Sequence, residues 1–125
     1  MYKRQNRLFF DIKCWDSDKH ERVTGVPNDT ILDNFRRLRA ELPDLDVVVR
    51  TPVIPGINDT KTEIEAIAEF VNETGGASAY ELLPYHGFGE PKYTKLGKHY
   101  RLSHLLPPPP ARLTELRQVA ASYGL

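Results

Sequence analysis

Cysteine is almost absent from this 125-residue chain, because Cys14 is the only one. A single cysteine excludes a disulfide within the chain, so its fold has to rest on packing alone. Such cysteine usage is typical of proteins that work in a reducing compartment. We therefore expect a cytoplasmic protein.

Long apolar runs and an excess of charge are also missing. No segment is long and apolar enough to suggest a transmembrane helix, and no signal peptide is visible. The 17 basic and 17 acidic residues give a formal net charge of zero. A balanced chain has no global field that would attract nucleic acid or an anionic membrane. We expect neither among its partners.

The chain instead alternates short apolar runs with segments of helical periodicity. The predicted strands are residues 7–15, 46–51 and 78–85, and the predicted helices are residues 31–42, 60–71 and 113–123. Residues 16–30 are expected to form a loop. Parallel strands are the expected pairing where whole helices separate them, so the order β-α-β-α-β plus a C-terminal helix predicts an α/β fold. The chain is too short for a closed eight-fold barrel of about 250 residues.

Local signals mark where some of these elements begin and end. Asn28 or Thr30 has the side chain needed to cap the helix that follows. Pro52 is expected to stop the second strand, because proline lacks the N–H that a sheet needs. Thr60 and Glu63 have the spacing of a capping box at the start of the next helix.

Charged or ring-bearing polar residues stand where the three predicted strands end, at Asp11, Lys13, Arg50 and His86. Strand ends of a parallel αβ barrel converge on one mouth, so these residues point to one site. Asp11 and Lys13 are two apart and face the same side of their strand. A carboxylate and an ammonium group so placed suit a zwitterionic ligand with an α-amino acid moiety. The alternative is a structural ion pair shared with Arg50 or Glu81.

Other chemistries have weaker support in the sequence. A Schiff-base role for Lys13 needs a neutral amine, whereas the nearby Asp11 favours the charged form. Cys14 as a nucleophile has no base that the sequence identifies. The histidines are not spaced as zinc ligands.

Several short motifs together carry a family resemblance. They are residues 11–13 (DIK), 18–20 (DKH), 24–25 (TG), 50–59 (RTPVIPGIND), 81–86 (ELLPYH), 92–93 (KY) and 96–97 (LG), with Asn28, Gly89 and Tyr100. In order and spacing they resemble the glycyl-radical enzyme activating enzymes of the radical S-adenosylmethionine superfamily. The type member of these is pyruvate formate-lyase activating enzyme. The resemblance runs from about residue 7 to the C-terminus.

The resemblance implies a fold, an activity and roles for single residues. The implied fold is a partial (βα)6 TIM-like barrel, of which this chain is similar to the last three βα units. In this family a [4Fe–4S] cluster cleaves S-adenosylmethionine, and the 5′-deoxyadenosyl radical takes a hydrogen atom from a glycine of a partner enzyme. By position, Asp11, Ile12, Lys13 and His86 would contact S-adenosylmethionine. Arg50 would lie near the cofactor or the substrate glycine loop.

The resemblance also implies partners, and one departure from the family pattern limits what this chain does alone. The partners would be a glycyl-radical enzyme similar to pyruvate formate-lyase and an electron donor, flavodoxin or ferredoxin. The family's cluster is held by a Cys-x3-Cys-x2-Cys motif, and one cysteine cannot replace three. We therefore expect no metal ligands here and no activity of the chain alone. The alternative is a non-catalytic half-barrel that binds a partner protein.

The start of the chain is unusual as well. Residues 1–5 (MYKRQ) run straight into an apolar strand and resemble the translation of a sequencing-library adapter. We expect residues 1–6 to be an adapter artefact or a disordered start, and residues 7–125 to be a truncated half-barrel domain. A strand at residues 8–12 that lacks an upstream neighbour would present an apolar edge prone to aggregation.

Overall fold

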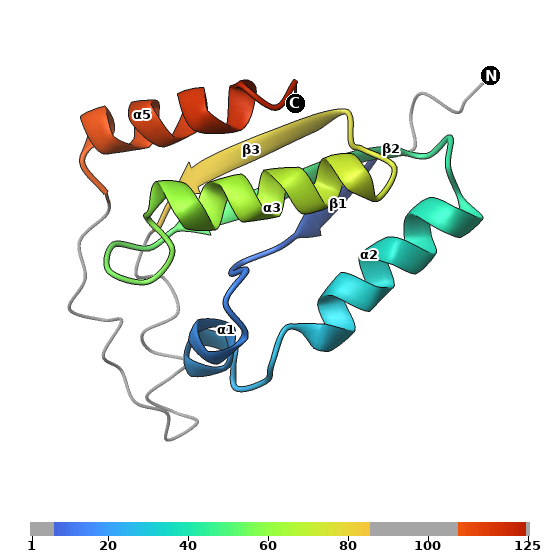
Figure 1. The fold of residues 1–125 in the computed structure, drawn as a ribbon, viewed down its shortest axis with the longest axis horizontal. Coiled ribbons are helices and arrows are strands. Elements are labelled where there is room, and N and C mark those ends of the chain that lie inside the picture. The colour runs from blue at the N-terminus through green and yellow to red at the C-terminus, as the bar shows by residue number, and fades with distance from the viewer. Residues whose placement is uncertain (1–6, 86–107, 125) are drawn as a thin grey trace.

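The computed structural model describes residues 7–85 and 108–124 (Figure 1). The elements are β1 (Arg7–Asp11), α1 (Ser17–Thr24), α2 (Asp29–Glu41), β2 (Asp46–Val53), α3 (Lys61–Glu73), β3 (Ala79–Pro84) and α5 (Pro110–Ala121). Predictions for residues 1–6, for His86 and for the motifs between residues 89 and 100 lie outside the described part. No helix within it is long and apolar enough to cross a membrane.

The three strands form one sheet in the order β1-β2-β3, with β1 and β3 both parallel to β2. The predicted α/β class and the β-α-β-α-β order are therefore confirmed, and α5 is the predicted C-terminal helix. In the described part of the chain, β1 pairs only with β2 and is an edge strand. Its Leu8 and Phe9 are exposed, as the prediction of an apolar edge requires.

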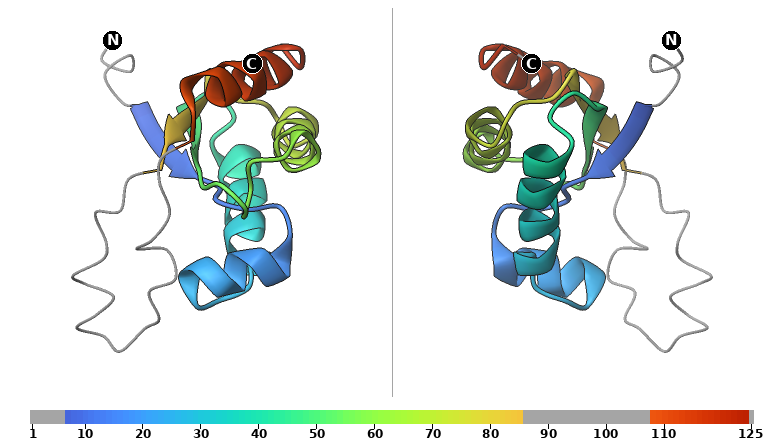
Figure 2. Two further views of the ribbon diagram at one scale, coloured as in Figure 1. Left: turned by 90° about the vertical axis from the view of Figure 1, so that its left-hand side faces the viewer. Right: turned by 90° about the vertical axis from the view of Figure 1, so that its right-hand side faces the viewer.

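Helices α2 and α3 cover one face of the sheet, and α5 lies beside α3 along β3 (Figure 2). Buried apolar side chains of the strands and of these three helices form a single core. The core residues on the strands are Val47, Val49, Val53, Tyr80 and Leu82, with Phe10 of β1 packed against them and Ile12 following just after β1. Because successive strand residues point to opposite faces, the residues between these lie on the other face of the sheet. That second face carries the predicted site.

The segment expected to be a loop contains a two-turn helix, α1, so that prediction was wrong. The Asp16 side chain caps α1 by accepting the N–H groups of Asp18 and Lys19. Gly25 ends it with a left-handed φ of 90° and an N–H bonded to the Glu21 carbonyl. Only His20 of this helix is buried, so the apolar stripe that identifies a helix in sequence is missing.

Strand β2 continues through Pro52 to Val53, two residues beyond the predicted end. The Arg50 carbonyl accepts the N–H of Ile12, whereas the Val53 carbonyl accepts the N–H of Tyr85. The backbone groups of β2 thus alternate between its two neighbours, and Pro52 faces the β1 side. The ladder with β1 ends at Arg50, so the missing N–H of Pro52 breaks no sheet hydrogen bond.

Two of the predicted helix caps have different outcomes. The Thr60 side chain accepts the Glu63 N–H at 3.2 Å, as the capping-box spacing predicts. The Glu63 carboxylate, however, does not complete the box and bonds elsewhere. Asn28 does stand at the N-cap of α2, but its side chain makes no capping bond. Both side chains bind the segment that follows β1.

Candidate functional site

A row of three charged residues crosses the second face of the sheet. The strand register places Asp11 beside Arg50 and Arg50 beside Glu81. The preceding row is Phe10, Val49 and Tyr80, which belongs to the core on the helix face. The charged row therefore points away from α2 and α3 and lies near the carboxyl ends of the strands, where parallel αβ folds bind ligands.

Arg50 and Glu81 form an ion pair within this row. The Arg50 Nε lies 3.1 Å from Glu81 Oε1, and the Arg50 guanidinium carbon lies 3.8 Å from the centre of the Phe9 ring. The side chains of Arg50 and Glu81 keep 34% and 45% of their surface exposed. The arginine thus finds the acidic partner that its position after three valines requires, while remaining accessible from the second face.

Asp11 and Lys13 do not take part in that ion pair. Asp11 is exposed and Lys13 is half-buried. Within the described residues, no ion pair or side-chain hydrogen bond joins either of them to another side chain. Among the described residues, the structural ion pair is therefore that of Arg50 with Glu81.

The main chain around Lys13 is held by four side chains from other parts of the chain. Thr51 Oγ1 donates to the Ile12 carbonyl at 2.5 Å, and Asn58 Nδ2 donates to the Lys13 carbonyl at 2.7 Å. Asn28 Nδ2 donates to the carbonyls of Cys14 and Trp15, at 3.2 and 2.7 Å. The Glu63 carboxylate accepts the N–H groups of Trp15 and Asp16, at 2.8 and 3.1 Å. We call residues 12–16 the tethered segment.

Sequence reasoning missed these four side chains as parts of the site. Glu63 was interpreted only as a cap, Asn28 as a cap and a motif residue, and Thr51 and Asn58 only as parts of the 50–59 motif. Their hydrogen-bond partners are main-chain groups. Every residue type carries such groups, so the amino-acid sequence does not show which residue is the partner. The available signals were that Asn28, Thr51 and Asn58 belong to the quoted motifs and are polar residues near predicted strand or helix ends.

Cys14 lies within the tethered segment and is fully buried. Burial, followed by the negative charge of Glu63, raises the pKa of the Cys14 thiol to about 12. The thiol is therefore protonated at neutral pH and a poor nucleophile, because the thiolate is the reactive form. Among the described residues, no group of three His, Cys, Asp or Glu side chains could hold a metal ion. This donor set does not fit a [4Fe–4S] cluster.

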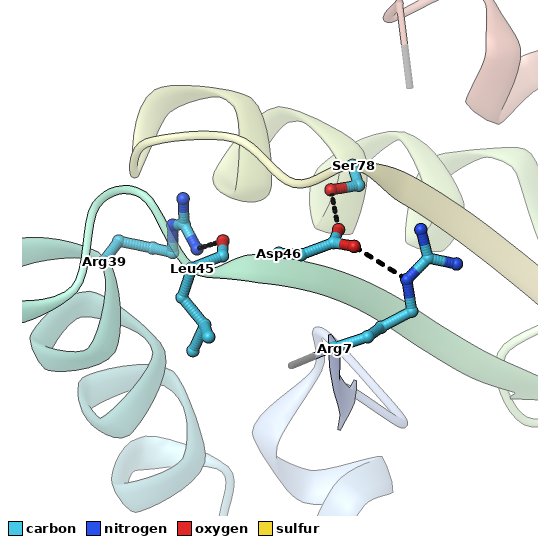
Figure 3. Close-up of polar contacts among 5 residues, drawn as sticks. All are labelled: Arg7, Arg39, Leu45, Asp46 and Ser78. Atoms are coloured by element: carbon cyan, nitrogen blue, oxygen red, sulfur yellow. Dashed lines mark hydrogen bonds and ion pairs between the residues drawn. The ribbon is translucent and has the colours of Figure 1, made fainter. Parts of the chain in front are cut away.

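The opposite ends of the strands are fixed by a separate polar cluster (Figure 3). The Arg7 guanidinium and the Ser78 hydroxyl both bond the Asp46 carboxylate, which joins the starts of all three strands. These bonds, the one from Ser78 first, lower the pKa of Asp46. Arg39 of α2 donates to the carbonyls of Leu45 and Pro43, at 3.0 and 2.7 Å. These contacts fix the starts of the strands and lie at the far end of the sheet from the charged row.

Of the predicted site residues, the structure places Asp11 beside Arg50 in the strand register, and Lys13 follows two residues later, just beyond the end of β1. Ile12 is fully buried in the core. Its N–H and its carbonyl are bonded to Arg50 and Thr51 within the protein. His86 lies outside the described residues, and its role stays a prediction.

Comparisons with known proteins give relatives of consistent description, although no family model matches. The chain is 47% identical over 95 residues to the (2S)-3-sulfopropanediol sulfolyase activating enzyme of Bilophila wadsworthia, covering 76% of this chain and 31% of that protein. It is 37% identical over 117 residues to the indoleacetate decarboxylase activating enzyme of Tractidigestivibacter scatoligenes, covering 94% of this chain and 36% of that protein. It is 36% identical over 108 residues to the pyruvate formate-lyase-activating enzyme of Staphylococcus epidermidis, covering 86% of this chain and 42% of that protein.

A solved structure agrees with these relatives. A domain of pyruvate-formate lyase-activating enzyme from Bacteroides vulgatus matches with a TM-score of 0.75 and 28% identity, covering 96% of this chain and 64% of that chain. The chain spans less than half the length of these curated relatives. Sequence and fold thus confirm the predicted relationship to the activating enzymes of glycyl-radical enzymes.

Proposed function

We propose, from this relationship to the activating enzymes of glycyl-radical enzymes, that the chain is part of a radical S-adenosylmethionine activase. Its role there would be to bind S-adenosylmethionine at the carboxyl ends of β1 and β2. The observation that supports the proposal is that Asp11 and Arg50 are register neighbours at the carboxyl ends of β1 and β2, with Lys13 two residues after Asp11. That placement is independent of the sequence identity to the relatives.

The charges of these residues suit the methionine moiety of the cofactor. The Asp11 carboxylate is suited to its ammonium group, and the Lys13 ammonium group to its carboxylate. Arg50, held by Glu81 and Phe9, would face the adenosyl end of the cofactor or the glycine loop of the protein substrate. His86 is included in this proposal on the family resemblance alone. S-adenosylmethionine would supply the radical chemistry.

The residues of this chain do not fit an iron–sulfur cluster. One buried, protonated thiol does not supply the ligands of a [4Fe–4S] cluster, so we derive no step from this chain's residues to the cluster. We propose that the cluster ligands of the activase are cysteines that these 125 residues do not include, and that the chain alone is inactive. The protein substrate would be a glycyl-radical enzyme, and the electron donor a flavodoxin or ferredoxin.

The test is a titration of the chain with S-adenosylmethionine, followed by amide chemical shifts and by calorimetry. We expect shifts concentrated at residues 11–13 and around Arg50, and weaker binding for Asp11→Asn and Lys13→Met. Arg7→Met is the matched control, because Arg7 lies on the same sheet face but at the opposite strand ends. Its affinity should equal that of the unsubstituted chain.

Two results would contradict the proposal. Equal weakening by Arg7→Met and Lys13→Met would indicate a nonspecific charge effect. Binding of a glycyl-radical enzyme without any binding of S-adenosylmethionine would favour the alternative of a non-catalytic interaction module.

A further inference from the structure

Asn58 connects the ends of the two strands that carry the proposed cofactor residues. Its side chain is fully buried and makes three hydrogen bonds. Oδ1 accepts the Ile54 N–H at 2.7 Å, and Nδ2 donates to the carbonyls of Lys13 and Pro52, at 2.7 and 2.8 Å. The same amide group therefore binds the main chain of Lys13 and a main-chain group two residues beyond Arg50.

Glu63 holds the other half of the tethered segment. It stands in the first turn of α3, where the helix dipole favours a negative charge. Its carboxylate is buried and accepts the N–H groups of Trp15 and Asp16. Asp16 in turn caps α1. Glu63 thus fixes the chain between β1 and α1 from the side of α3.

We propose that Asn58 and Glu63 are positioning residues for the S-adenosylmethionine site. They fix the main chain of residues 13–16, and with it the point from which the Lys13 side chain extends, before any ligand arrives. Neither side chain would touch the cofactor. This inference rests on the proposed function, but the tethering itself is measurable without a ligand.

Cys14 provides the measurement. Its thiol is fully buried inside the tethered segment, and it is the only cysteine of the chain. A disulfide reagent such as 5,5′-dithiobis(2-nitrobenzoate) reacts with it only when the segment opens. The labelling rate therefore reports opening, and its urea dependence separates local opening from global unfolding. Asn58→Ala changes no charge, so it alters the access of the reagent rather than the charges around the thiol.

The experiment compares Asn58→Ala and Glu63→Gln with two kinds of control. Asn72→Ala removes an asparagine that also donates to a main-chain carbonyl, that of Tyr123, at the far end of α3. Glu69→Gln neutralises an exposed glutamate of the same helix. Leu116→Ala deletes a fully buried side chain of α5 and lowers global stability without touching the tethered segment.

We expect Asn58→Ala and Glu63→Gln to raise the labelling rate in the absence of urea roughly tenfold or more, because buried hydrogen bonds are lost. The urea dependence of labelling should fall at the same time. Asn72→Ala and Glu69→Gln should stay within about twofold of the unsubstituted chain, as expected for exposed sites. If the two variants label at the rate that their global stability dictates, with the urea dependence of Leu116→Ala, the inference is wrong.

The affinity for S-adenosylmethionine then distinguishes this inference from the proposed function. We expect Asn58→Ala to open the segment and weaken binding, and Lys13→Met to weaken binding without a change in labelling. An opened segment with unchanged affinity would overturn the positioning role alone. Unchanged affinity in Lys13→Met would overturn the proposed function. Lack of binding by the unsubstituted chain would overturn the proposed function together with the cofactor part of this inference, while labelling still decides the tether.

Discussion

The ion pair of Arg50 and Glu81 offers a test of whether this arginine serves the fold or a ligand. The pair has an N–O distance of 3.1 Å, but its side chains remain 34% and 45% exposed. Pairs this exposed are screened by solvent and typically contribute about 0.2–1 kcal/mol. The contact with the Phe9 ring adds roughly 0.5–1 kcal/mol at a site of this exposure. We therefore expect Arg50→Met to lower the free energy of unfolding by no more than about 2 kcal/mol.

The assay is a double-mutant cycle of Arg50→Met and Glu81→Gln, measured by urea denaturation at low salt and in 1 M NaCl. The coupling free energy should be below about 1 kcal/mol at low salt and should shrink further in 1 M NaCl. The same Arg50→Met variant should bind S-adenosylmethionine or the glycine loop of the protein substrate much more weakly. A salt-independent coupling above about 3 kcal/mol, with ligand binding unchanged, would show a structural arginine and refute the reasoning.

Two further predictions concern the core and the buried thiol. Phe35 is fully buried and its ring centre lies 5.3 Å from that of Phe10 and 5.6 Å from that of Phe70, so Phe35→Ala should cost about 3–5 kcal/mol in urea denaturation. A loss below about 1 kcal/mol would contradict this packing. The folded thiol of Cys14 has a pKa raised from 9.0 to about 12, so the unfolded state binds fewer protons between these values. Stability should fall as pH rises from 9 to 12, and Cys14→Ala should remove part of that loss; an identical loss in both proteins would count against a buried thiol.

The sheet could be predicted from sequence because its signals are local and strong. The three valines before Arg50 and the cap at Thr60 each specify an element without reference to the rest of the chain. Parallel pairing follows from the helices between the strands. Helix α1 was not predicted, because it is stabilised by caps at its ends, Asp16 and Gly25, and presents almost no apolar side chain to the core. Its cap residues were visible in the sequence, but they were interpreted as loop composition.

The candidate site was only half predictable, for a related reason. Asp11, Lys13 and Arg50 could be identified because charges at the ends of apolar strands are uncommon and call for a partner. The alignment of Asp11, Arg50 and Glu81 in one row depends on strand register, which the sequence does not state. Asn58 and Glu63 act on main-chain groups 45 to 48 residues away, so nothing near them in the sequence reveals their partners.

The two sets of polar groups at the carboxyl ends of β1 and β2 differ in a way that bears on function. The groups that bind main chain, on Asn58, Glu63 and Thr51, are buried and hydrogen-bonded. The groups that face outward, on Asp11 and Lys13, make no ion pair with another described residue. Because buried hydrogen bonds hold the main chain from Ile12 to Asp16, ordering this segment around a charged ligand would cost less conformational entropy than ordering a free loop.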